Sequence, residues 1–169
     1  MKGITEEKAL THFRVLLCVW VLIANTIFHY AKIEIGWIVF ISNALLFTFP
    51  GDMKKKFFST VCGALTGLVL SAGMILVMVL LEPVIGEFLS FVIPLGAVLY
   101  VIIVLQTKAP LFLNTASFVY LTCSCIKAEE YMQHLSRYFL VFLLGCVVFN
   151  AGTLLLLRYC FRNVAPTKE

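Results

Sequence analysis

The sequence predicts an all-helical integral membrane protein, a bundle of six transmembrane helices, from three observations. Of its 169 residues, 62% are hydrophobic and 13% are charged, against roughly 45–50% apolar and about 25% charged in soluble domains. Six long stretches contain no Asp, Glu, Lys or Arg, and the basic residues gather in alternate connections between them. So few charged residues cannot cover the surface of a water-soluble fold, so lipid must be the solvent for most of the chain.

Each predicted span is about as long as a membrane crossing requires. A hydrocarbon core about 30 Å thick takes about 20 mostly apolar residues of helix. A barrel would instead alternate apolar and polar residues over short strands, and residues 74–81 (MILVMVLL) show no alternation. We expect residues 1–169 to form one membrane domain, whose spans cover residues 15–31, 35–51, 57–81, 88–107, 109–126 and 138–157.

The basic residues predict the orientation. The first, third and fifth connections together contain three of the thirteen Lys and Arg residues: Lys32 in the first, none in the third, and Lys127 and Arg137 in the fifth. The other ten lie at the termini or in the second and fourth connections. Because Lys and Arg mark cytoplasmic segments, both termini are predicted to be cytoplasmic. The net charge of +4 is then a topology signal, and no nucleic-acid partner is needed to explain it. The ten basic residues at the termini and in the second and fourth connections are Lys2, Lys8, Arg14, Lys54, Lys55, Lys56, Lys108, Arg158, Arg162 and Lys168.

The six spans divide into two three-helix units, residues 1–81 and 82–169. Asn43 precedes Phe47 by four residues in the second span, as Asn114 precedes Phe118 in the fifth. A duplicated unit with an odd number of spans enters the membrane upside down, which is the inverted repeat common among transporters. The sequence therefore predicts a 3+3 inverted repeat.

The second and fifth spans are short and are bounded by proline. We predict a helix break at Pro50 and Gly51, which close the second span, and Pro110 opens the fifth. Short, interrupted segments at matching places of two halves are the best sequence indication of a transport site.

Several residues around these two spans carry a family resemblance: Trp37, Phe40, Phe47, Pro50 and Gly51, then Gln106 and Lys108. From about Trp37 to Leu157 the chain resembles a family of small bacterial inner-membrane proteins known only as a domain of unknown function. The resemblance implies a six-helix protein of the bacterial cytoplasmic membrane and implies no substrate. The family's fifth span carries a Pro-Gly pair where this chain has Ala116 and Ser117.

Two sets of side chains in the spans are candidates for a function. The first is a stripe of small residues at four-residue intervals, Ser59, Gly63, Gly67 and Ser71. Such a stripe lets another helix backbone approach closely, so we predict helix packing here. A pore lining is the alternative interpretation.

The second set contains amides, because asparagines at residues 25, 43, 114 and 150 lie inside predicted spans. An amide left alone in hydrocarbon costs several kcal/mol, so each must face a partner or water. Hydrogen bonds between helices are one interpretation, and a path for a small polar solute is the other. An amide suits an uncharged or weakly charged solute better than a bare ion. The predicted pathway residues are Asn43, Asn114, Ser42, Thr115, Ser117 and Asn150.

The missing residue types limit the mechanism. No charged residue lies near the middle of a predicted span, so passive passage is a simpler hypothesis than ion-coupled pumping. We expect no enzymatic activity, cofactor or metal, since His29, Cys123, Cys125 and His134 form only a weak ligand pattern. The sequence favours a channel or transporter for a small polar solute that assembles as a homo-oligomer. The alternative is a non-transporting scaffold or assembly subunit.

Overall fold

The computed structural model describes residues 6–162, a range that excludes Lys2 and Lys168 of the charge count. Within this range the chain forms helices and no strand, which confirms the all-helical prediction. In chain order the helices are α1 (Glu6–Tyr30), η1 (Glu34–Gly36), α2 (Trp37–Leu46), α3 (Met53–Ile85), α4 (Glu87–Leu105), α5 (Thr115–Ile126), α6 (Ala128–Gln133), α7 (Leu135–Val141), η2 (Phe142–Cys146, a π-helical turn) and α8 (Val147–Phe161).

In the described part of the chain, four helical segments are long and apolar enough to cross a membrane: Glu6–Tyr30, Met53–Ile85, Glu87–Leu105 and Leu135–Phe161. The predicted second and fifth spans form shorter apolar helices instead, Glu34–Leu46 and Thr115–Ile126.

Turn-forming residues at one end of each of these two predicted spans explain why the helices are short. α2 ends before Pro50, and Gly51 has a φ of 109°, a backbone conformation that favours glycine. α5 begins only after Asn114, whose side chain caps the helix. The turns that precede Asn114 include Pro110.

The distribution of side chains along α4 is the reverse of that in a water-soluble protein. Its buried residues include Ser90 and Pro94, whereas large apolar side chains are exposed on it: Phe88, Leu89, Phe91, Val92, Ile93, Val101, Ile103 and Val104. Exposed apolar area on this scale needs an apolar solvent or a partner. Lipid supplies the first, in agreement with the composition.

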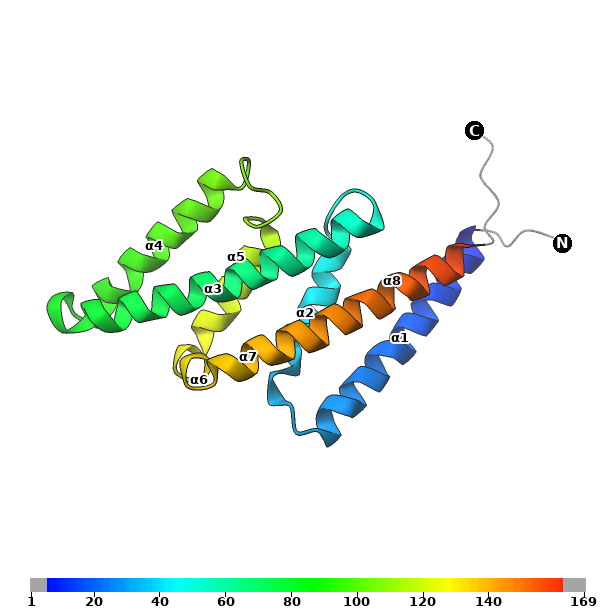
Figure 1. Cartoon of the computed structure of the whole chain (residues 1–169), viewed down its shortest axis with the longest axis horizontal. Coiled ribbons are helices and arrows are strands. Elements are labelled where there is room, and N and C mark those ends of the chain that lie inside the picture. Colours follow the sequence, from blue (N-terminus) through cyan, green and yellow to red (C-terminus); the bar gives the residue numbers. More distant parts are fainter. Residues whose placement is uncertain (1–5, 163–169) are drawn as a thin grey trace.

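Two long helical rods organise the bundle: α3, and the continuous segment Leu135–Phe161 that we call the α7–α8 rod. α3 packs along α4 and α5, and α8 packs along α1. α2 contacts η2, α8 and α3. Figure 1 shows α4 beside α3 at one edge of the molecule and α1 beside α8 at the other, with the short α2 and α5 crossing the two rods. The short helices therefore lie where the two halves of the bundle meet.

The contact between α1 and α8 depends on one large and one small residue. The Trp20 ring stacks on the Phe149 ring at 5.5 Å between centroids, and its Nε1 donates to the Phe149 carbonyl over 3.3 Å. Gly152 makes room for this ring, because a Cβ there would lie 2.9 Å from Cε2 of Trp20. In lipid, where no hydrophobic effect drives helices together, such close packing holds α1 in place.

Replacing Gly152 by alanine is expected to lower the free energy of unfolding by about 1–3 kcal/mol, because the added methyl overpacks this contact. Thermal unfolding in detergent measures the loss, and tryptophan fluorescence reports the displaced Trp20. Gly73→Ala is the matched control, since a Cβ at Gly73 meets nothing within 4 Å. Equal stability of the two variants would contradict the packing role of Gly152.

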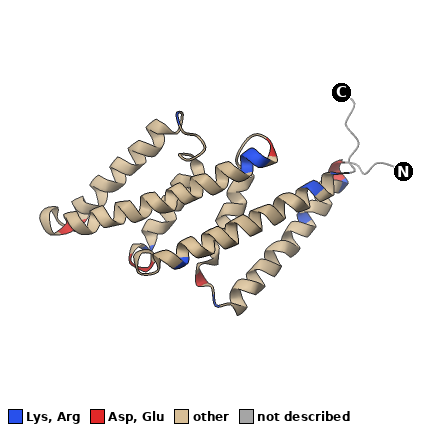
Figure 2. Cartoon of the chain, viewed as in Figure 1, with Lys and Arg blue, Asp and Glu red and all other residues tan. Residues whose placement is uncertain are grey.

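In the described part of the chain, charged residues lie in loops, in the short helices and toward the ends of the long helices, and the middles of the long helices carry none (Figure 2). The connection predicted between the fifth and sixth spans contains α6, with an ion pair between Lys127 and Glu130 at 2.8 Å. The Glu130 side chain raises the pKa of Lys127, and the bond from Lys127 lowers the pKa of Glu130. Both groups are solvent-facing, so the pair contributes little to stability.

Candidate functional site

The predicted stripe of small residues lies on the face of α3 that contacts α5. A Cβ on Gly63 would overlap the side-chain amide of Asn114, and a Cβ on Gly67 would lie 2.8 Å from Cβ of Tyr120. Ser59 and Ser71 are buried on the same helix. The glycines therefore set the distance between the α3 and α5 backbones.

Asn114 both caps α5 and joins it to α3. Its Oδ1 accepts from the backbone N–H groups of Ala116 at 2.9 Å and Ser117 at 3.4 Å. Its Nδ2 donates to the Ser59 carbonyl of α3 at 3.0 Å and also to the carbonyls of Pro110 and Leu111. The hydrogen-bonding capacity of this amide is fully used by the protein itself. Neighbouring Thr115 is exposed, on the outside of α5.

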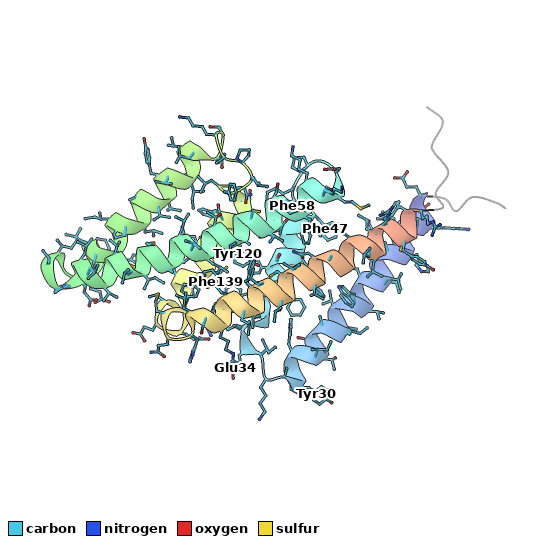
Figure 3. The ribbon with its side chains drawn as sticks, in the orientation of Figure 1. Tyr30, Glu34, Phe47, Phe58, Tyr120 and Phe139 are labelled. Carbon is cyan, nitrogen blue, oxygen red and sulfur yellow. The ribbon has the colours of Figure 1, made fainter. Side chains whose placement is uncertain are left out.

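Ser42 and Asn150 meet in a different place, the contact between α2 and α8. Asn150 Nδ2 donates to Ser42 Oγ at 2.6 Å, and both side chains are fully buried. One turn earlier, the Ile38 carbonyl of α2 accepts from the Cys146 thiol at 3.6 Å and from the Tyr120 hydroxyl of α5. Figure 3 places Tyr120 near the middle of the molecule. Three helical segments thus meet around a buried polar patch.

The pairing of residues shows that α2 and α8 run parallel at this contact. Ile38 faces Cys146, and four residues further along each chain Ser42 faces Asn150. Asn43 follows Ser42 directly, and Thr153 is one helical turn beyond Asn150. The register therefore carries Asn43 and Thr153 to the same end of the contact. Asn150 lies close to the middle of the apolar segment Leu135–Phe161.

Four buried side-chain oxygens find no hydrogen-bond partner between residues 6 and 162. One is Oγ of Ser124 on α5, and the other three belong to α2 and α8: Oδ1 of Asn43, Oδ1 of Asn150 and Oγ1 of Thr153. We call these three oxygens the oxygen cluster. Asn150 and Thr153 are fully buried, and Asn43 is 7% exposed. An unsatisfied polar atom of this kind costs about 1–3 kcal/mol, so each of the three calls for a partner.

Thr153 differs from the other threonines in the middle of described helices. Five of them donate their hydroxyl to the carbonyl four residues earlier, as helical threonines often do: Thr11, Thr26, Thr60, Thr66 and Thr122. The carbonyl in that position for Thr153 belongs to Phe149 and accepts Trp20 instead. The Thr153 hydroxyl is left available to the oxygen cluster.

Thr153 and Tyr120 are not among the site residues predicted from the sequence. The signal for Thr153 was its spacing, because it follows Asn150 by three residues and so lies on the same face of a helix. Tyr120 gave no comparable signal, since its contact with Ile38 joins residues far apart in the chain.

The weak ligand pattern in the sequence consists of His29, Cys123, Cys125 and His134. Within residues 6–162 no three His, Cys, Asp or Glu side chains come close enough together to hold a metal ion. Asn25 is exposed and lines a groove of about 610 Å³ with His29 and Glu34. This groove lies at the ends of α1 and α2, away from the oxygen cluster.

Over residues 6–162 the chain is helical, and four of its helical segments are long and apolar enough to cross a membrane, which is the pattern of an integral membrane protein. Residues 13–156 match the family described as "Protein of unknown function (DUF1097)", and the chain belongs to this family. No curated protein and no solved structure matches the chain. The family description assigns no activity.

Proposed function

We propose that the protein is a channel or transporter for a small polar solute and that its pathway passes the contact between α2 and α8. The observation that carries the proposal is the oxygen cluster, three buried side-chain oxygens on α2 and α8 that lack hydrogen-bond partners among the described residues. Polar groups at membrane depth usually face a partner or a water-filled path. A protein that needed only rigid packing would gain stability from apolar residues in these places.

The packing pattern supports a 3+3 inverted repeat with six crossings as part of this proposal. α3, the last helix of the first unit, packs on α4 and α5 of the second unit. In the same way α8, the last helix of the second unit, packs on α1 and α2 of the first. This reciprocal exchange is what a two-fold relation between the units produces, with α2 and α5 as the corresponding short helices.

The charges support both termini lying on the cytoplasmic side, which we propose to be that of a bacterial inner membrane. Figure 2 shows basic residues at the outer ends of α1 and α8, at the start of α3 and between α4 and α5. Acidic residues gather in the connections at the opposite end of the bundle, among them Glu34, Glu87 and Glu129. The exposed apolar faces of α1 and α4 leave surface for packing against copies, so a homo-oligomer is part of the proposal.

The second candidate function, a scaffold subunit, is favoured by the other amide. Asn114 is saturated by bonds within the protein and packs against Gly63. An amide of this kind stabilises a helix contact and offers nothing to a solute. The predicted pathway residues therefore fall into two groups. Asn114 belongs to a helix contact, and transport is proposed through Ser42, Asn43 and Asn150 alone.

Flux in proteoliposomes tests the proposal. The purified protein is expected to carry at least one of a panel of small neutral and charged solutes faster than empty lipid does. Asn150→Leu is expected to reduce that flux about tenfold or more, since it removes an interaction of the size of one buried hydrogen bond.

Asn25→Leu is the matched control, because it removes an exposed amide on α1, and it is expected to leave the flux unchanged. Both variants are first checked for a single folded species in detergent. No flux above empty lipid for any solute, with folded protein, would reject transport and leave the scaffold function.

A further inference from the structure

We propose that the protein binds one phospholipid with an ethanolamine headgroup at the end of the bundle where α1 meets η1. Two grooves lie there. The polar groove is the groove of about 610 Å³ that contains Glu34, and the apolar groove, of about 320 Å³, lies between α1 and the α7–α8 rod. The two are neighbours, because Phe28 and Ile33 line both. Neither contains a residue of the oxygen cluster, so this inference is independent of the proposed transport.

The apolar groove has the chemistry and the depth that an acyl chain requires. All of its lining side chains are apolar, and the one side-chain N–H among them, that of Trp20, already donates to the Phe149 carbonyl. On α1 the lining runs from Trp20 to Phe28, which covers about 12 Å along the helix axis. One leaflet supplies half of a hydrocarbon core about 30 Å thick, so the groove is nearly as deep as the acyl region of one leaflet.

The polar groove lies at the level of the lipid headgroups. Figure 3 shows Tyr30 and Glu34 at the same end of the molecule, and the Tyr30 side chain is exposed. Exposed tyrosines are enriched where the hydrocarbon meets the aqueous interface. Lys32 and Glu34 line the groove, and Arg137 lies beside it, since its Nη2 donates to the Lys32 carbonyl at 2.9 Å.

The charges at this groove are of both signs and are not paired with one another. The ion pair found between residues 6 and 162 joins Lys127 and Glu130 instead. A phosphate group accepts hydrogen bonds from lysine and arginine side chains, and an ammonium group donates to a carboxylate. An ethanolamine phospholipid carries one of each, so its phosphate matches Lys32 and Arg137 and its ammonium matches Glu34. A headgroup with negative charge alone would leave Glu34 facing a like charge.

An acyl chain fits the apolar groove better than a helix of a second copy does. A helix is about 10 Å across, so a stretch about 12 Å long occupies roughly 900 Å³. The apolar groove holds about 320 Å³. A helix would stay mostly outside it, whereas an acyl chain is a single file of methylene groups. A water-soluble zwitterion would leave the apolar groove unfilled, and a phospholipid fills both grooves.

Quenching of tryptophan fluorescence tests the site. The chain has two tryptophans, so Trp37→Phe leaves Trp20, which lines the apolar groove, as the reporter. Bromine quenches tryptophan on contact. Phosphatidylethanolamine with brominated acyl chains is therefore expected to quench the fluorescence of this variant in detergent in a saturable manner.

Phosphatidylglycerol and diacylglycerol with the same brominated chains separate the headgroup from the chains. Phosphatidylethanolamine is expected to reach half-maximal quenching at a concentration about fivefold lower than phosphatidylglycerol and about tenfold or more lower than diacylglycerol. Equal concentrations for phosphatidylethanolamine and diacylglycerol would overturn the headgroup site. Binding of phosphatidylglycerol as tight as that of phosphatidylethanolamine, or tighter, would overturn the assignment of the ethanolamine group.

Lys32→Gln in the same background locates the phosphate. It removes one charge and keeps the backbone carbonyl that binds Arg137, and it is expected to raise the half-quenching concentration of phosphatidylethanolamine about fivefold. Lys108→Gln is the matched control, since it removes an exposed lysine between α4 and α5 that does not line either groove. Equal values for Lys32→Gln and Lys108→Gln would overturn the assignment to this groove.

Glu34→Gln locates the ammonium group. It is expected to abolish the preference for phosphatidylethanolamine over phosphatidylglycerol, because the carboxylate that matches the ammonium is gone. An unchanged preference in this variant would overturn the role of Glu34 and with it the choice of an ethanolamine headgroup.

Discussion

Replacing Gly67 by leucine is expected to abolish the folded, monodisperse species in detergent. Gly67 lies at a close approach of α3 and α5, and a Cβ there would collide with the Ser117 carbonyl and lie 2.8 Å from Cβ of Tyr120. The first of these obstacles is backbone, which cannot turn away as a flexible side chain can. Overpacking a core costs about 1–3 kcal/mol even where side chains can adjust, and a leucine here must move a whole helix.

The consequence extends beyond one contact, because Tyr120 also donates to the Ile38 carbonyl of α2. Displacing α5 therefore disturbs the patch where α2, α5 and η2 meet. Size-exclusion chromatography and thermal unfolding measure the effect. Gly73→Leu on the same helix is the control, since Gly73 is exposed and a Cβ there meets nothing within 4 Å. A Gly67→Leu protein with the wild-type elution profile and Tm would refute the packing role.

The sequence was sufficient to predict which segments form helices. It was not sufficient to predict the lengths of two of them, the helices of the second and fifth spans. Composition and charge spacing locate α1, α3, α4 and the α7–α8 rod, because a long uncharged stretch in lipid has no alternative to helix. The same criterion cannot show that the fifth helix starts late, at Thr115, because residues 109–114 carry no charge although they form turns instead of helix. The pattern of Asn114 followed three residues later by Ser117 was the available signal, because it forms a capping box.

The sequence predicts which polar residues belong to the candidate site, but it does not predict which side chains bond one another. Asn43, Asn114 and Asn150 stand out in any apolar sequence, and all three are buried. Their roles differ because of neighbours that spacing cannot reveal. Asn114 reaches a carbonyl of α3, 55 positions away in the chain, whereas Asn150 finds a serine of α2, 108 positions away. Only the folded arrangement shows which amide is saturated and which has an oxygen left.

Replacing Asn114 by alanine is expected to lower the free energy of unfolding by about 2 kcal/mol. About half of this comes from the lost cap on α5 and half from the lost bond to the Ser59 carbonyl. The side chain also fills the space left by Gly63, so a cavity adds to the loss. Chemical or thermal unfolding in detergent measures the difference.

Asn114→Ser separates the two contributions, and serine is the matched control for the cap. A serine hydroxyl caps a helix about as well as an amide oxygen, yet it is too short to bridge to α3. We therefore expect Asn114→Ser to recover about 1 kcal/mol relative to alanine and to stay less stable than wild type by the value of the link to Ser59. If alanine at this position left stability unchanged, Asn114 would be free for another role, and the division of the amides into one packing residue and two pathway residues would fail.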